Sequence, residues 1–161
     1  MSWKSGFTDR AEDTLGNTRI ALRRQPAALA STELLRAIEA CGPSLARGVL
    51  TALEVNIDEV AARADMIASE RGANLPLRRV PTQSASLEMI VRRAAEEAAM
   101  LGHRRVGTEH LLLAIISLHD DPATTALRAA GVTQDTARGT IRRLLVSWTD
   151  NGTPRPRVSA A

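Results

Sequence analysis

The fold is indicated most clearly by the segment LGHRRVGTEHLLLAII, residues 101–116. Thr108 and Glu109 precede an unbroken run of apolar residues. A threonine N-cap followed by an acid in the first turn is a favourable helix start, because both side chains face the free N–H groups of the helix end. On the other side of the loop, Gly102 directly follows a helical pattern, in the position of a left-handed C-cap. The stretch therefore predicts two helices joined by a short loop.

The helix before this loop shows the clearest periodicity in the chain. Between Ser84 and Leu101, apolar residues recur at steps of three and four, as on one face of an amphipathic helix. The acids and arginines between them are expected to face solvent. The predicted buried stripe consists of Leu87, Ile90, Val91, Ala94, Ala95, Ala98 and Leu101.

Similar periodicity along the rest of the chain predicts an all-α fold of eight helices, and no segment alternates with the period of two that a strand shows. Asn56 and Thr133 are predicted N-caps, and Gly72 and Gly131 are predicted C-caps. The expected helices span residues 8–24, 31–40, 43–53, 56–71, 84–101, 108–118, 122–130 and 133–146.

The two halves of the chain repeat one another. At an offset of 77 residues, Leu34, Leu35, Ala37 and Ile38 align with Leu111, Leu112, Ala114 and Ile115. Upstream the better offset is 76, so the first half has lost one residue. We therefore predict two pseudo-symmetric four-helix repeats packed into one globular domain. The predicted divisions are an N-terminal arm at 1–6, repeat one at 7–71, a linker at 72–83, repeat two at 84–146 and a disordered tail at 147–161.

Two stretches carry a resemblance to a known family. The segment 101–116 and the sequence FTDRAEDTL of residues 7–15 resemble the Clp N-terminal domain. This double Clp repeat stands at the front of ClpA-, ClpB- and especially ClpC-type AAA+ unfoldases. The resemblance covers about residues 7–146 and implies a helical domain that binds protein or peptide segments without catalysis.

The sequence also departs from the family pattern. Repeat one reads QPAALASTELLRAI where the pattern is GH-x-x-x-GTEHLLLAI, and repeat two begins QSASLEM without the usual aromatic residue. No GxxxxGK[ST] motif is present, so the chain lacks the loop that cradles a nucleotide. We therefore expect a free-standing ClpC N-domain-like protein without a cofactor, and a fragment of a longer unfoldase stays open as a third possibility. Its expected partners are Clp unfoldase or protease components or their protein substrates.

The resemblance also implies candidate binding residues. In ClpC-like domains the glutamate of each GTEH motif resembles a recognition point for arginine-phosphorylated or basic segments, because a carboxylate matches the fork of an arginine side chain. Thr108 and Glu109 match the motif in repeat two. Thr32 and Glu33 match it in repeat one only if the missing residue follows Glu33. If the gap precedes Glu33, this residue falls at the position of the motif histidine.

Two further sets of residues are candidate contacts. Arg104 and Arg105 lie in the loop of repeat two and are candidates for contacting a phosphate on a modified substrate. The family also binds cyclic peptide antibiotics near the repeat starts, which makes Phe7 and Trp3 candidate hydrophobic contacts. Gln83 stands where the family usually places an aromatic residue for such a ligand.

Metal and catalytic sites are not predicted. His103, His110 and His119 are separated by seven and nine residues, which gives no shared helical face for metal binding. His103 and His110 are instead predicted to brace the loop through hydrogen bonds to the backbone. Cys41 has no histidine near it in sequence and is predicted to be a small, half-buried side chain rather than a nucleophile.

Composition argues against nucleic-acid and membrane binding. The formal net charge is only +3, arginine pairs are scattered among acids, and aromatic residues make up 2% of the chain. A basic patch with stacking side chains is therefore not indicated. The longest apolar run, 111–118, is far shorter than the roughly 20 residues that cross a bilayer. Without a signal peptide pattern, the expected location is the cytoplasm.

Two functions remain open from the sequence. The leading hypothesis is a non-enzymatic protein- or peptide-binding module of the Clp protease system. It would recognise substrates or adaptors, or sequester a ligand such as phosphoarginine or a cyclic peptide antibiotic. The alternative is a DNA-binding or dimerising stress regulator.

Overall fold

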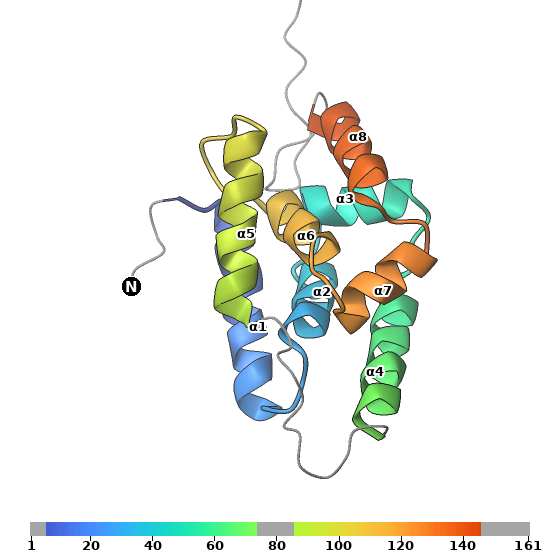
Figure 1. Cartoon of the computed structure of the whole chain (residues 1–161). Coiled ribbons are helices and arrows are strands. Elements are labelled where there is room, and N and C mark those ends of the chain that lie inside the picture. Colours follow the sequence, from blue (N-terminus) through green and yellow to red (C-terminus); the bar gives the residue numbers. More distant parts are fainter. Residues whose placement is uncertain (1–5, 74–85, 146–161) are drawn as a thin grey trace, which may run out of the picture.

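The computed structural model describes residues 6–73 and 86–145, and this part of the chain forms eight helices (Figure 1). The predicted all-α class is confirmed. One isolated parallel β-bridge joins Phe7 to Val106. No helix in the described ranges is long and apolar enough to cross a membrane. The helices are α1 (Asp9–Arg24), α2 (Ala30–Ala40), α3 (Leu45–Ala52), α4 (Ile57–Ala73), α5 (Leu87–Met100), α6 (Thr108–Ile116), α7 (Pro122–Ala129) and α8 (Gln134–Leu145).

The predicted N-caps at Asn56 and Thr133 are confirmed. The Oδ1 atom of Asn56 accepts hydrogen bonds from the N–H groups of Asp58 at 3.0 Å and Glu59 at 3.3 Å. The hydroxyl of Thr133 accepts one from the N–H of Thr136 at 3.2 Å. In both helices a short polar side chain satisfies backbone N–H groups that the first turn leaves without an intrahelical partner.

Two of the three predicted glycine C-caps have the left-handed conformation. Gly102 has φ 70° and Gly131 has φ 86°. In contrast, α4 continues through Gly72 to Ala73, two residues into the segment predicted as a linker. A glycine inside a helix costs only about 1 kcal/mol relative to alanine, so it does not end a helix by itself. The rest of the predicted linker, arm and tail lies outside the described residues, at 74–83, 1–5 and 147–161.

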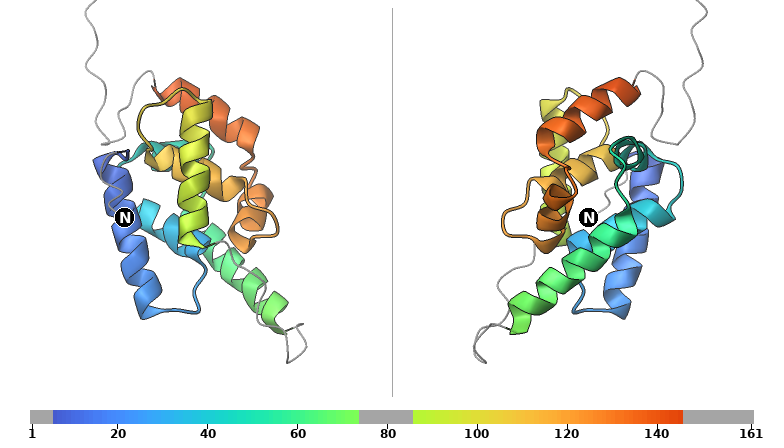
Figure 2. Two further views of the ribbon diagram at one scale, coloured as in Figure 1. Left: turned by 60° about the vertical axis from the view of Figure 1, so that its left-hand side comes forward. Right: turned by 90° about the vertical axis from the view of Figure 1, so that its right-hand side faces the viewer.

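The two repeats interlock. Helix α4 of repeat one packs along α7 of repeat two, and α3 of repeat one packs against α8 of repeat two. Helices α2 and α6 lie between these pairs and contact each other (Figures 1 and 2). One core therefore serves both repeats, as expected for halves that are too small to bury enough apolar surface alone. Its fully buried side chains on α2 and α6 include Leu34, Leu35, Ile38, Leu111, Leu112, Leu113 and Ile115.

The predicted stripe on α5 is wrong at one position. Ala95 is exposed, whereas Glu97 is only 5% exposed and faces the core. The two carboxylate oxygens of Glu97 accept hydrogen bonds from Arg138 on α8 at 3.1 and 2.9 Å. A carboxylate leaves water only when a charged partner compensates its lost hydration. The partner is distant in sequence, so the periodicity of α5 alone does not predict this burial.

Helices α3 and α7 each end in a turn of the same type, but the left-handed position of the two turns holds different residues. In each turn the N–H of a valine donates to the carbonyl five residues earlier, at 2.9 Å for Val55 and 3.0 Å for Val132. This bond is typical of a Schellman C-cap. The residue before the valine is Gly131, with φ 86°, in repeat two but Glu54, with φ 58°, in repeat one. The left-handed conformation costs a non-glycine residue about 1–2 kcal/mol.

We expect the substitution Glu54→Gly to raise the free energy of unfolding by about 0.5–1 kcal/mol. Glycine removes the cost of the left-handed conformation, and the greater freedom of glycine in the unfolded chain offsets part of the gain. Urea unfolding followed by circular dichroism measures the change. A lower unfolding midpoint in the variant would show that the turn is not strained at Glu54.

Candidate functional site

The loop between α5 and α6 is fixed by the start of repeat one. The N–H of Thr8 donates to the carbonyl of Val106 at 3.0 Å, and the N–H of Val106 donates to the carbonyl of Gly6 at 2.6 Å. The guanidinium of Arg105 donates to the carbonyl of Phe7. The first residues of repeat one and the GTEH segment of repeat two therefore form one corner of the molecule.

The predicted hydrogen bond to the loop backbone is confirmed for His110, whereas the side chain of His103 contacts the ring of His110. His110 is fully buried, and its Nδ1 accepts a hydrogen bond from the N–H of Gly107 at 2.8 Å, which assigns the ring proton to Nε2. That Nε2–H donates to Nδ1 of His103 at 2.7 Å. Burial, together with the nearby His103, lowers the pKa of His110 to about 4. The imidazole of His110 is therefore neutral at pH 7.

His103, Glu109 and His110 bring possible metal ligands together, since their ligand atoms lie within 4.8 Å of one another. The hydrogen bonds argue against a metal ion at this position. A metal bound to Nε2 of His110 would force the ring proton onto Nδ1, where the N–H of Gly107 already donates. The arrangement fits a hydrogen-bonded loop brace better than a metal centre.

Both motif residues at the start of α6 are buried. The N-cap is Gly107, one residue before the predicted cap, because the hydroxyl of Thr108 accepts a hydrogen bond from the N–H of Ala46 in α3 at 3.2 Å. Glu109 is 5% exposed. A Cβ atom at position 107 would lie 2.2 Å from Oε2 of Glu109. The glycine at this position therefore makes room for the carboxylate of Glu109.

Repeat one carries different side chains at the equivalent helix start. The hydroxyl of Ser31 donates to Oδ2 of Asp121 at the start of α7, at 2.9 Å, while the hydroxyl of Thr108 meets the start of α3. Ser31 and Thr108 are therefore equivalent, at the offset of 77 residues. This pairing favours the alignment in which Thr32 takes the place of the motif glutamate and Glu33 takes the place of the motif histidine.

Glu33 is already paired within its own chain. Its carboxylate contacts the guanidinium of Arg36 at 2.6 Å, and Arg36 also pairs with Asp65 of α4. A hollow of about 870 Å³ opens beside these three residues. Thr32 is fully buried, and its hydroxyl has no hydrogen-bond partner among the described residues. Repeat one therefore does not reproduce the arrangement around Glu109.

The other predicted contacts do not gather into one site. Arg104 and Arg105 are both exposed, and a guanidinium nitrogen of Arg105 lies 3.8 Å from the carboxylate of Asp9. Phe7 is only 5% exposed and belongs to the hydrophobic core, which corrects its prediction as a surface contact for a ligand. Trp3 lies outside the described residues.

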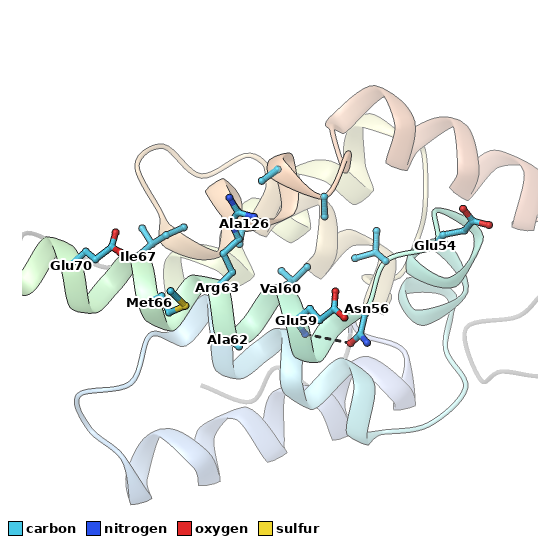
Figure 3. A pocket seen from close by; sticks show the side chains of 13 residues that line it. Glu54, Asn56, Glu59, Val60, Ala62, Arg63, Met66, Ile67, Glu70 and Ala126 are labelled. Carbon is cyan, nitrogen blue, oxygen red and sulfur yellow. Dashed lines mark hydrogen bonds between the residues drawn. The ribbon is translucent and has the colours of Figure 1, made fainter.

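A surface groove that the sequence analysis missed runs between α4 and α7 (Figure 3). Its volume is about 750 Å³, and the α7 side is formed by Ala126, Ala129 and Ala130. On the α4 side, Met66 lines the groove with 63% of its surface exposed, although most large apolar side chains of the described chain are buried. The groove therefore offers apolar surface to a binding partner.

The rim of the groove is mainly acidic. Glu54, Glu59 and Glu70 line it, and Arg63 is the single basic residue of the lining. All four side chains are exposed. Figure 3 shows Glu54 and Glu70 at opposite ends, with Glu59 between them. Helical periodicity predicts that such residues face solvent, but it gives no information on the neighbouring helix that completes a groove.

Comparison with known proteins shows the same double repeat. A model of the Clp repeat (R) N-terminal domain matches residues 6–130 and 82–160. The chain is 27% identical over 146 residues to the chaperone protein ClpB of Oceanobacillus iheyensis. It is 26% identical over 142 residues to the negative regulator of genetic competence ClpC/MecB of Bacillus subtilis. Each alignment covers 88% of this chain but only 17% of the relative.

Two solved structures share the fold. The Hsp104 N-terminal domain from Candida albicans superposes with a TM-score of 0.59 at 16% identity, over 94% of this chain and 98% of that domain. The N-terminal domain of the caseinolytic protease associated chaperone ClpD from Arabidopsis thaliana gives a TM-score of 0.61 at 16% identity, over 89% of this chain and 97% of that domain. The match of the family model across both repeats, with this shared fold, shows that the chain belongs to the Clp repeat N-terminal domain family.

Proposed function

We propose that this chain is a non-enzymatic module that binds protein or peptide segments for the Clp protease system. The observation that carries the proposal is the match of the family model to both repeats. A relative described as a probable ATP-dependent Clp protease ATP-binding subunit, from Chlamydia pneumoniae, supports the same context with 38% identity over 58 residues. The proposed partner is a Clp unfoldase in the cytoplasm, or a protein substrate of that unfoldase.

The proposed contact lies at the start of α6. A guanidinium or phosphoarginine group of a substrate would meet the carboxylate of Glu109 in the fork geometry that arginine favours. Because Glu109 is 5% exposed, binding requires its side chain to rotate away from Gly107. Arg104 is exposed in the same loop and would contact the phosphate. Repeat one is not expected to supply an equal site, because Thr32 stands at the position of the motif glutamate.

The experiment is a calorimetric titration with phosphoarginine and with an arginine-phosphorylated peptide. We expect the wild type to bind both ligands and Glu109→Ala to bind at least about tenfold more weakly, because a hydrogen bond to a charged group contributes about 1.5–3 kcal/mol. Glu33→Ala is the matched control and should bind like the wild type. Equal binding by Glu109→Ala would exclude this contact. Absence of wild-type binding would favour an adaptor protein or a cyclic peptide antibiotic as the ligand.

A further inference from the structure

At two positions that line the α4–α7 groove, α7 carries smaller side chains than its counterpart in repeat one. At the offset of 77 residues, Ala126 is equivalent to Val49 of α3, and Ala130 is equivalent to Leu53. The local backbone conformation is similar at these two helix ends: Leu53 has φ −91° and ψ 6°, and Ala130 has φ −85° and ψ 4°. Ala130 therefore leaves space where a leucine side chain stands in repeat one.

A carboxylate at one end of the groove is held in an unfavourable backbone conformation. Glu54 has φ 58°, at the position where repeat two has Gly131. Glycine would fit the turn with less strain, as it does in repeat two. Residues in sparsely populated backbone regions cluster at binding sites, so an observed outlier of this kind indicates a role for the side chain. Its carboxylate extends the acidic rim formed with Glu59 and Glu70.

We infer that the α4–α7 groove is a docking site for a polypeptide segment in which apolar side chains are flanked by lysine or arginine. An apolar side chain of the segment packs against the exposed Ala129 and Ala130 beside Met66, a flexible residue that adapts to different partners. The basic side chains pair with the carboxylates of the rim. Charge complementarity selects this class of segment over acidic ones. The inference rests on the proposed function and adds a second contact surface, apart from Glu109.

The test uses the full chain and two fluorescein-labelled peptides of equal length. One peptide has leucines between lysines, and the other has glutamate in place of each lysine. Fluorescence anisotropy is expected to show saturable binding of the basic peptide and at least tenfold weaker binding of the acidic one. Added salt is expected to weaken the binding of the basic peptide, because salt screens exposed charge pairs.

Variants of the groove separate its shape from its charge. Ala130→Leu introduces the leucine that repeat one carries in a similar backbone conformation. By filling the groove, this substitution is expected to lower the affinity for the basic peptide at least tenfold. The double variant Glu59→Lys, Glu70→Lys is expected to lower this affinity at least fivefold at low salt. Glu96→Lys, an exposed acid on α5 outside the groove, is the control and should bind like the wild type. Thermal unfolding verifies that each variant is folded.

The outcomes distinguish this inference from the proposed function. If the basic peptide binds the wild type, and the groove variants bind it equally well, the groove is not the docking site although the chain binds peptides. If the acidic peptide binds as tightly as the basic one, the inferred charge of the partner is wrong. If neither peptide binds but an unfolded protein does, the groove inference fails and the proposed function stands. If the chain binds no polypeptide at all, both fail.

Discussion

The substitution Leu112→Ala is expected to lower the free energy of unfolding by about 2–5 kcal/mol, a large fraction of the stability of a small domain. Leu112 is fully buried in α6, which lies in the core shared by both repeats. Truncating it removes apolar contacts and leaves a cavity that the surrounding helices fill only in part. Urea unfolding measured by circular dichroism gives the loss. Ile20→Ala, at a side chain that is 48% exposed, is the control and should cost much less.

The same substitution tests whether the repeats unfold together. Because α6 packs directly against α1, α2 and α3 of repeat one, weakening α6 should also weaken repeat one. Hydrogen exchange measured by mass spectrometry should therefore show faster exchange in α2 as well as in α6. If α2 kept the protection of the wild type while α6 lost it, the two repeats would be separate folding units and the interlocked core would be contradicted.

Acidification from pH 7 to pH 5 is expected to cost the wild type about 2 kcal/mol more than it costs His110→Gln. The pKa of His110 is lowered from 6.5 to about 4 by burial and by His103. Between these two values the unfolded chain binds a proton that the folded chain does not bind. The contribution of His110 to stability is therefore complete above pH 6.5 and falls as the pH decreases toward 4.

Glutamine is the matched replacement because it does not titrate and its side-chain oxygen can accept the hydrogen bond of Gly107, as in a capping box. Urea unfolding of both proteins at the two pH values gives the difference, and effects of the carboxylates cancel in the comparison. If the two proteins lost stability in parallel, His110 would take up its proton equally in the folded and unfolded chains. The assigned network of His103, His110 and Gly107 would then be incorrect.

The sequence predicted the elements well because their signals are local. Asn56 and Thr133 cap their helices, and Gly102 and Gly131 adopt left-handed conformations, because each depends on a few neighbouring residues. The resemblance to the Clp repeat followed from contiguous motifs. The prediction that His110 braces the loop through a backbone hydrogen bond was confirmed for the same reason, since Gly107 lies three residues away, whereas His103 contacts the ring of His110.

The parts that the sequence did not predict depend on contacts between distant residues. Glu97 is buried because Arg138 reaches it from another helix, and the hydroxyl of Thr108 is used by α3 instead of capping its own helix. Phe7 joins the core because the start of the chain pairs with Val106. The α4–α7 groove likewise depends on which helices become neighbours. Periodicity shows which face of a helix is buried, but not which helix covers it.

The most direct test of the proposed function is a fluorescence anisotropy titration of the chain with a permanently unfolded protein, reduced and carboxymethylated α-lactalbumin, using native α-lactalbumin as the control. A module that binds polypeptide segments should bind the unfolded protein saturably and should not bind the native form. The mass of the unfolded protein should stay unchanged. No binding of the unfolded protein, together with no response to phosphoarginine, would contradict the proposed function. Cleavage of the unfolded protein would contradict its non-enzymatic nature.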